Sequence, residues 1–204
     1  PYFRKFNHSK LTFSLMYAYS ENFVLVLSHD EVVHLKCSML GKMPGDKSDK
    51  FANLKLAYAY MCGHPGKKLL FMGQEFAQWN EWSEKKALDW YLLEDEEHKK
   101  MQDFTRKCMK LGKNYRCLYE TDYSGDGFRW INANDKDNST YSFVRVSPDG
   151  KKHLLFVLNF TPVERDNFRI GVPAKGKYKL VLGNDERNQK KQLTAVAGDC
   201  DGYK

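Results

Sequence analysis

Acidic side chains follow a strongly apolar run near the beginning of the sequence. Residues 23–27 are all apolar, and the next four, 28–31, read SHDE. Carboxylates at such a point can act as nucleophile, proton donor or electrostatic stabiliser when positive charge develops, as it does when a glycosidic bond is cleaved. Asp30 is the residue we expect to carry chemistry. On spacing alone, a polar loop that caps the strand, with Asp30 paired to a lysine, is an equally good interpretation.

A second polar segment follows another short apolar run. Residues 69–72 are apolar, and residues 73–82 combine carboxylates, amides and two tryptophans. Indole rings stack on the apolar faces of sugars, and Gln and Glu can bind sugar hydroxyls. The alternative is that Trp79, Trp82 and Trp90 only pack the loop against its neighbours. His34 is similarly open, since it suits either a groove or a packed loop.

The elements around these two segments alternate in type. The pattern predicts a mostly buried helix over residues 9–20, a strand over 23–27 and a long irregular segment over 28–47. Apolar residues spaced three, four and three apart then predict helices around residues 51–61 and 101–111, with a strand at 69–72 between them. Fully apolar strands that alternate with helices indicate a parallel sheet covered on both faces, as in an α/β barrel. Chemistry in such barrels lies at the carboxyl ends of the strands.

Beyond residue 120 the pattern becomes that of short strands. Runs at 128–131, 140–146, 153–160 and 177–182 are separated by turn signals, of which 183–185 is the last. This spacing predicts an antiparallel sandwich or small barrel. We therefore expect two domains, with residues 1–118 derived from an α/β barrel and residues 119–204 forming an all-β domain.

The overall composition limits the class of protein. With 204 residues, 42% of them hydrophobic, the chain can form one domain or two small ones with a packed core. The charge of +7 comes from scattered lysines, so we expect a solvated surface rather than a nucleic-acid site. The five cysteines are widely spaced, which favours reduced packing residues and no metal site. No run approaches the roughly 18 apolar residues that span a bilayer and no leader opens the chain, so we expect a cytoplasmic protein without membrane association.

Several of these segments together resemble the 1,4-α-glucan (glycogen) branching enzymes of the α-amylase superfamily. The resemblance rests on residues 27–34, on MPGD at 43–46 and on GQEFAQ at 73–78, and it extends over most of the chain, becoming weaker in the last twenty residues. It implies the last two strands of a (β/α)8 (TIM) barrel with their flanking helices, followed by a C-terminal β-sandwich. It also implies cleavage of α-1,4-glucosidic linkages in glycogen or amylose and transfer of the cut chain to a 6-hydroxyl, without a cofactor.

The resemblance assigns roles to individual residues. Asp30 is implied to be the transition-state stabiliser, which is neither the nucleophile nor the acid/base, and His29 is implied to donate a hydrogen bond to the same sugar. Glu31, Glu75 and Trp82 are implied to bind the glucan. An α-glucan hydrolase or debranching enzyme of the same superfamily remains an alternative, as does a non-catalytic carbohydrate-binding module.

Parts of the family pattern are missing or altered. The nucleophilic Asp and the acid/base Glu of the family belong to earlier barrel strands, and we find no match for either segment. We therefore expect these 204 residues to be inactive alone and to be a piece of a longer chain. The exposed barrel edges would then pair with the missing N-terminal part or with another copy. Val26 and Leu35 occupy positions where the family more usually has Pro and Gly.

Overall fold

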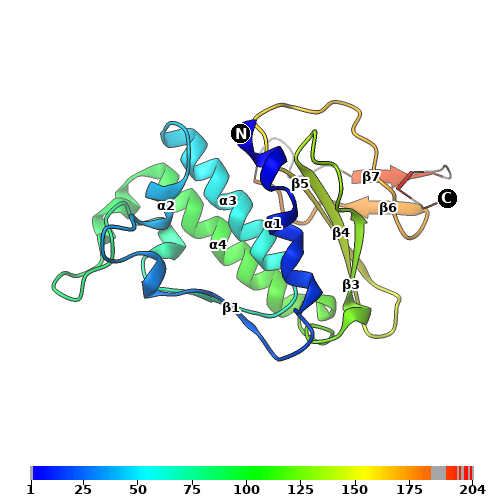
Figure 1. The fold of residues 1–204 in the computed structure, drawn as a ribbon, viewed down its shortest axis with the longest axis horizontal. Coiled ribbons are helices and arrows are strands. Elements are labelled where there is room, and N and C mark those ends of the chain that lie inside the picture. Colours follow the sequence, from blue (N-terminus) through cyan, green and yellow to red (C-terminus); the bar gives the residue numbers. More distant parts are fainter. Residues whose placement is uncertain (1, 185–191, 197, 199, 202, 204) are drawn as a thin grey trace. The chain divides into compact units, whose positions relative to one another are not determined.

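The computed structural model describes residues 2–184, 192–196, 198, 200, 201 and 203. They form two compact units, each described by itself below. Residues 24–114 make up a helical unit, while residues 1–23 and 115–204 make up a β unit (Figure 1). The assignment of residues 1–118 to a barrel and 119–204 to an all-β domain stays a prediction. Asp185, from the last expected turn, lies outside the described residues.

The helical unit contains two strands that pair in parallel. Strand β1 (Val24–Leu27) pairs with β2 (Lys67–Leu70), and the register places Leu27 opposite Leu70. The chain between them forms a short helix α2 (Met39–Lys42) and a long helix α3 (Lys47–Gly63), so the expected strand–helix–strand order is confirmed. The two strands form a sheet of their own, and the complete barrel is therefore not visible in the described residues.

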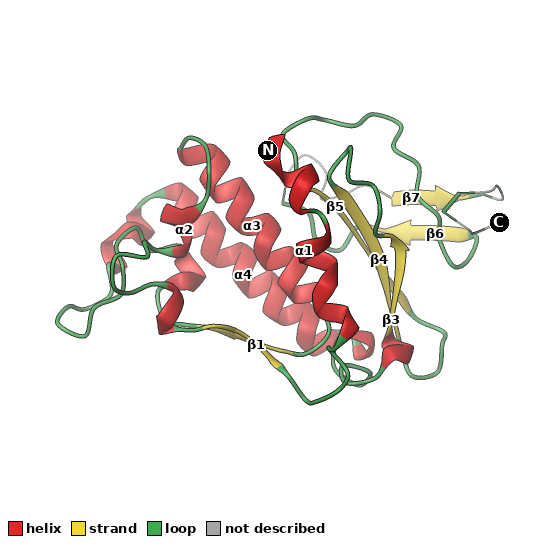
Figure 2. Cartoon of the chain, in the orientation of Figure 1, coloured by secondary structure: helices red, strands yellow, loops and turns green. Residues whose placement is uncertain are grey.

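Helix α3 packs against helix α4 (Glu96–Asn114), as the apolar spacing predicts (Figure 2). Asp46 caps the start of α3, because its Oδ1 accepts a hydrogen bond from the Asp49 amide at 2.9 Å. Buried apolar side chains from both helices and the neighbouring loops form the core of the unit: Leu40, Phe51, Leu54, Phe76 and Met101. His98 on α4 ties the second polar loop to this core through Nδ1, which lies 2.8 Å from the Phe76 carbonyl oxygen.

One face of β1 is not covered, contrary to the sequence-based expectation of a strand buried on both faces. Val24 and Val26 are 47% and 48% exposed, and Leu69 on the neighbouring strand is 42% exposed. A continuous apolar run indicates burial on both faces only when a second layer is available for each face. Here the two-stranded sheet exposes apolar side chains that a larger sheet assembly would cover.

The β unit contains an antiparallel sheet with β4 in the centre. Strands β3 (Phe128–Asn132), β4 (Thr140–Val146) and β5 (His153–Asn159) follow one another in the sheet, and β6 (Gly176–Lys179) pairs with β7 (Gln192–Ala195). Phe143 of β4 is fully buried and stacks on Phe156 directly across from it, with ring centroids 4.8 Å apart. The sequence predicted the first four of these strands but not β7.

Residues 1–23 belong to the β unit, and their helix is shorter than predicted. The expected helix over 9–20 is present as α1 (Ser9–Thr12) followed by a 3-10 turn at Phe13–Met16. The segment is anchored by His8, whose ring stacks on Tyr141 at 4.1 Å, while the Tyr141 hydroxyl donates to the His8 carbonyl oxygen at 2.9 Å. Among the described residues, no helix has the length and apolar character needed to cross a membrane.

A buried ion pair crosses the interior of the β unit. Arg145 on β4 is 0% exposed, and its Nη2 lies 3.1 Å from Oδ1 of Asp122, which is 1% exposed. Arg145 Nε also donates to the Gly127 carbonyl oxygen at 3.0 Å. Each charge removed from water therefore has a charged partner, and the loss of either partner leaves the other desolvated and uncompensated.

Asp122→Ala is expected to lower the free energy of unfolding of the β unit by about 3–5 kcal/mol, because it leaves the buried Arg145 charge without its carboxylate. Denaturant unfolding followed through Trp130, which lies on β3, measures the change. Glu120→Ala is the matched control, since Glu120 forms an ion pair with Arg116 at the surface of the same unit, and it should leave the transition nearly unchanged. Equal effects of the two variants would contradict the assigned role of the buried pair.

Candidate functional site

The predicted catalytic residue Asp30 and the predicted sugar-binding residues His29 and Glu31 form a tight turn at the carboxyl end of β1. Ser28 begins the 3-10 turn His29–Glu31, and its Oγ accepts a hydrogen bond from the Asp30 amide at 3.2 Å. A hydroxyl at this position satisfies a backbone donor that the turn leaves free. The turn directs the Asp30 and His29 side chains to solvent, where they are 71% and 55% exposed. His29 Nε2 lies 3.3 Å from Asp30 Oδ1, and Ser28 Oγ donates to Asp30 Oδ2 at 3.3 Å.

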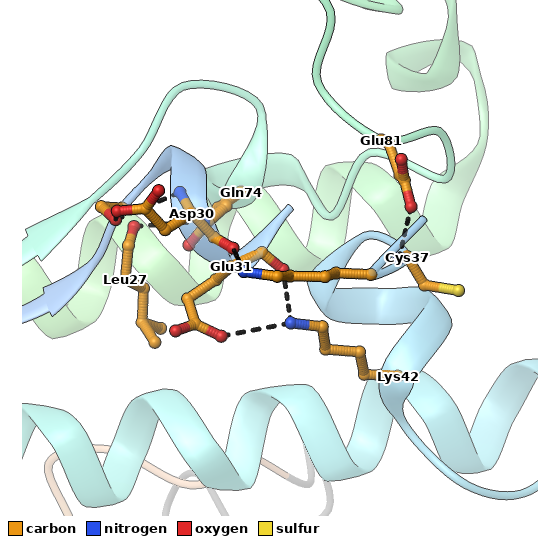
Figure 3. Close-up of polar contacts among 9 residues, drawn as sticks. Leu27, Asp30, Glu31, Cys37, Lys42, Gln74 and Glu81 are labelled. Atoms are coloured by element: carbon orange, nitrogen blue, oxygen red, sulfur yellow. Dashed lines mark hydrogen bonds and ion pairs between the residues drawn. The ribbon is translucent and has the colours of Figure 1, made fainter. Parts of the chain in front are cut away.

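Two lysines donate hydrogen bonds to backbone carbonyl groups of the turn, and one of them, Lys42, is labelled in Figure 3. Lys36 Nζ donates to the Asp30 carbonyl oxygen at 2.8 Å. Lys42 Nζ lies 3.2 Å from Glu31 Oε2 and also donates to the Glu31 carbonyl oxygen. Glu31 is thus held by Lys42 from helix α2, while the Asp30 carboxylate faces solvent. The sequence assigns no role to either lysine, because the segment over residues 28–47 is predicted to be irregular and no regular period relates its side chains to one another.

The second polar loop is bound to the end of β1. Gly73 begins it in a left-handed conformation, with φ of 86°, and the 3-10 turn Gln74–Phe76 follows. The Phe71 amide donates to the Leu27 carbonyl oxygen at 3.0 Å, and Gln74 Nε2 donates to the same oxygen at 3.1 Å (Figure 3). The Leu27 carbonyl group therefore joins the beginnings of the two loops that follow β1 and β2.

The structure places Trp82, but not Glu75, toward the first loop. The Trp82 amide donates to the Val32 carbonyl oxygen at 2.9 Å, and its indole meets the Phe71 ring edge to face with centroids 5.1 Å apart. The His29 ring also lies next to Phe71, with centroids 5.9 Å apart, so Phe71 lies between two of the four predicted sugar-binding side chains, His29 and Trp82. Glu75 lies near Tyr58 of α3 instead. Burial raises the pKa of the Tyr58 phenol, and the negative charge of Glu75 raises that pKa further.

A shallow surface hollow lies between the two loops, with space for little more than a water molecule. Its lining combines apolar side chains, among them Val32, Met72 and Trp82, with the amides Gln74 and Gln78. These residue types can contact a sugar, but the hollow itself is too small to enclose a sugar ring. Trp82 is the member of the predicted site that lines the hollow, whereas Asp30, His29, Glu31 and Glu75 lie outside the lining.

The other two tryptophans of this region pack within the unit. Trp79 meets His98 and Phe51 edge to face, with centroids 6.2 Å and 6.4 Å away, and Trp90 lies 5.0 Å from Phe76. Both rings therefore make packing contacts within the unit, while 37% of Trp79 and 52% of Trp90 stays exposed to solvent. In the described part of the chain, no three His, Cys, Asp or Glu side chains are grouped so that they could hold a metal ion.

The loop after the Asp30 turn has an unusual backbone. His34, Leu35 and Cys37 have φ values of 56°, 66° and 64°, in the left-handed region that side chains other than glycine disfavour. Leu35 is also 95% exposed, so its side chain gains almost nothing from packing. The resemblance noted above has glycine at this position, and the backbone supplies the physical reason for that preference.

Comparison with known proteins finds a matching family domain and several curated relatives. Residues 130–204 match the C-terminal all-beta domain of the alpha amylases. The chain is 52% identical to a 1,4-alpha-glucan branching enzyme GlgB of Butyrivibrio fibrisolvens over 98% of its own length and 33% of that protein. It is 54% identical to the GlgB of Thiobacillus denitrificans and 49% identical to that of Aquifex aeolicus, over 91% and 92% of the chain and 25% and 30% of those proteins. The chain thus spans a quarter to a third of the length of these curated relatives.

Leu35→Gly is expected to raise the free energy of unfolding of the helical unit by about 0.5–1 kcal/mol, since relief of left-handed strain exceeds the extra entropy of glycine in the unfolded chain. The change in the free energy of unfolding is measured by denaturant unfolding of the wild type, Leu35→Gly and a control variant, followed by tryptophan fluorescence. Glu84→Gly is the control, because Glu84 is exposed on the second loop and its φ is not positive, so there glycine should destabilise. If Leu35→Gly lowers the free energy of unfolding as much as the control does, the interpretation that Leu35 is strained is wrong.

Proposed function

We propose that this chain belongs to the 1,4-α-glucan branching enzyme family and is the C-terminal part of such an enzyme. The whole enzyme cuts α-1,4-glucan chains and transfers the cut piece to a 6-hydroxyl, forming α-1,6 branches in glycogen. The observation that carries the proposal is 49–54% identity to three such enzymes over more than 90% of the chain. The position of Asp30 at the carboxyl end of a parallel strand, with its carboxylate facing solvent, supports it.

Each predicted site residue has a role in this proposal. Asp30 binds sugar hydroxyls and stabilises the positive charge that develops at the anomeric carbon as the glycosidic bond breaks. His29, next to it, donates a hydrogen bond to the same sugar. Trp82 provides an apolar face in the hollow, while Glu31 and Glu75 accept hydrogen bonds from further glucose units. This chemistry requires no metal and no organic cofactor.

The nucleophile and the acid/base are assigned to upstream barrel strands. A retaining site needs two carboxyl groups about 5–5.5 Å apart, one that forms the glycosyl-enzyme and one that protonates the leaving 4-oxygen and then deprotonates the attacking 6-hydroxyl. We infer that β1 and β2 are the last two strands of a (β/α)8 barrel that includes those groups. The uncovered apolar face at Val24, Val26 and Leu69 supports this inference, because a closed barrel would cover it.

Further parts of the proposal follow from the same assignment. The exposed strand edges would pair with the upstream strands or, in their absence, with a second copy of the chain. A cytoplasmic location for the whole enzyme also stays a prediction. The alternative of a hydrolase or debranching enzyme differs in its product, because water rather than a sugar hydroxyl then resolves the glycosyl-enzyme.

In the full-length protein, Asp30→Asn is expected to lower the branching rate on amylose by about a hundred- to a thousandfold, since the neutral amide cannot stabilise the developing charge. The assay counts α-1,6 linkages formed per unit time by debranching and chromatography of the released chains. Asp103→Asn, on the exposed surface of α4, should retain the wild-type rate. Wild-type protein that produces new reducing ends without α-1,6 linkages would exclude branching, and an Asp30→Asn rate within threefold of wild type would remove Asp30 from the site.

These 204 residues alone are expected to form no α-1,6 linkages from amylose, because no segment of the chain matches the nucleophile or acid/base strands of the family. The same linkage assay, at equal molar concentration of the chain and the full-length enzyme, measures this. Branching activity of the isolated chain above the buffer blank would refute the assignment of both groups to upstream strands.

A further inference from the structure

We propose that Glu81 is a positioning residue that holds the loop after the Asp30 turn in its working conformation. Glu81 lies on the second loop, and its carboxylate accepts hydrogen bonds from two backbone amides of the first loop. The Leu35 amide donates to Oε2 at 3.0 Å. The Cys37 amide donates to Oε1 at 2.6 Å (Figure 3). Each carboxylate oxygen thus binds one amide. The inference rests on the proposed function.

The loop requires an external partner because its backbone conformation is unfavourable. Both clamped residues, Leu35 and Cys37, are left-handed, and so is His34 before them. These amides belong to no helix or strand and lie in exposed residues, so water is their alternative partner when Glu81 does not bind them. Hydrogen bonds to an ionised carboxylate are stronger than those to a neutral acceptor. Glu81 therefore supplies the interaction that stabilises this strained segment.

The clamp acts on Asp30 through Lys36. Lys36 lies between the two clamped residues, and its ammonium donates to the Asp30 carbonyl oxygen at 2.8 Å. Loss of the clamp frees the backbone that carries Lys36 and with it one of the contacts that hold the Asp30 turn. Glu81 itself has no role in binding sugar in this account, so it is not a catalytic residue.

The segment that carries Glu81 is itself fixed. On one side, Asn80 Nδ2 donates to Asp89 Oδ2 at 2.8 Å. On the other side, the Trp82 amide donates to the Val32 carbonyl oxygen at 2.9 Å. Asn80 thus fixes the segment that carries Glu81 independently of the first loop, while Trp82 adds a second link between the two loops next to the Glu81 contacts. Because Val32 and Trp82 both line the hollow, the same segment also maintains the hollow.

The test uses four variants of the full-length enzyme: Glu81→Ala, Glu81→Gln, the control Glu84→Ala and the double variant Glu81→Ala with Leu35→Gly. Glu84 is an exposed carboxylate three positions further along the same loop. Gln keeps one acceptor oxygen but turns an NH₂ donor toward the second amide, so it should lie between Ala and wild type. Branching kinetics on amylose, thermal unfolding and amide exchange of the peptide that covers residues 34–37 are measured for each.

Glu81→Ala is expected to lower kcat about ten- to a hundredfold with KM changed less than threefold, because Asp30 acts mainly on the transition state. Amide exchange at residues 34–37 should accelerate at least tenfold, while the unfolding temperature stays near that of Glu84→Ala. The double variant with Leu35→Gly should have a kcat at least three times that of Glu81→Ala alone, because glycine adopts the left-handed conformation without the clamp. A general structural role for Glu81 would not produce this rescue.

Unchanged exchange at residues 34–37 in both Glu81 variants, or a kcat within threefold of Glu84→Ala, would overturn the proposal. So would a loss of kcat that Leu35→Gly leaves entirely unrepaired. If Glu81→Ala fails to fold, Glu81→Gln provides the same comparisons. Wild-type enzyme without branching activity would refute the proposed function and the role of Glu81 in it, whereas amide exchange would still decide whether the carboxylate holds the loop.

Discussion

The Leu27 carbonyl group is the point on which the arrangement of the site depends. It accepts hydrogen bonds from the Phe71 amide at 3.0 Å and from Gln74 Nε2 at 3.1 Å, using both lone pairs of one oxygen. Because β1 and β2 run parallel and in register, their carboxyl ends meet there, and the two polar loops leave the sheet at one edge. An antiparallel pair would have placed the Asp30 turn and the segment around Trp82 at opposite ends.

The core of the helical unit has favourable geometry, whereas the backbone beside the site is strained. The core around Phe51, Leu54 and Met101 follows ordinary rules of apolar burial and capping, and it makes the unit rigid. At the site, by contrast, Leu35 has a left-handed backbone, which costs stability. Strain of this kind persists where the surrounding structure imposes it, and it is found most often at functional positions. The strained residues His34, Leu35 and Cys37 lie just after the turn that carries Asp30, so the strain is adjacent to the residues assigned to substrate without including them.

Much of the fold could be predicted because its signals are local. Helices α3 and α4 follow from apolar residues spaced three and four apart, and β4 and β5 follow from runs of strand-forming residues bounded by turns. The contacts that define the site are not local. Leu35 and Glu81 are 46 positions apart, and no pattern in the intervening sequence predicts that they are hydrogen-bonded. The exposed face of β1 could not be predicted either, since an apolar run does not report which layers are present to cover it.

The exposure of Asp30 links the apolar face of the sheet to the proposed chemistry. A carboxylate stabilises developing positive charge most strongly where water is excluded, because water screens the interaction. At 71% exposure, Asp30 cannot be effective until another surface covers the site. In the proposed enzyme, the upstream strands that cover Val24 and Val26 also bring the nucleophile and the acid/base to the same edge. Burial of the apolar face and assembly of the three carboxylates then become one event, so catalysis depends on the same hydrophobic contacts that complete the fold.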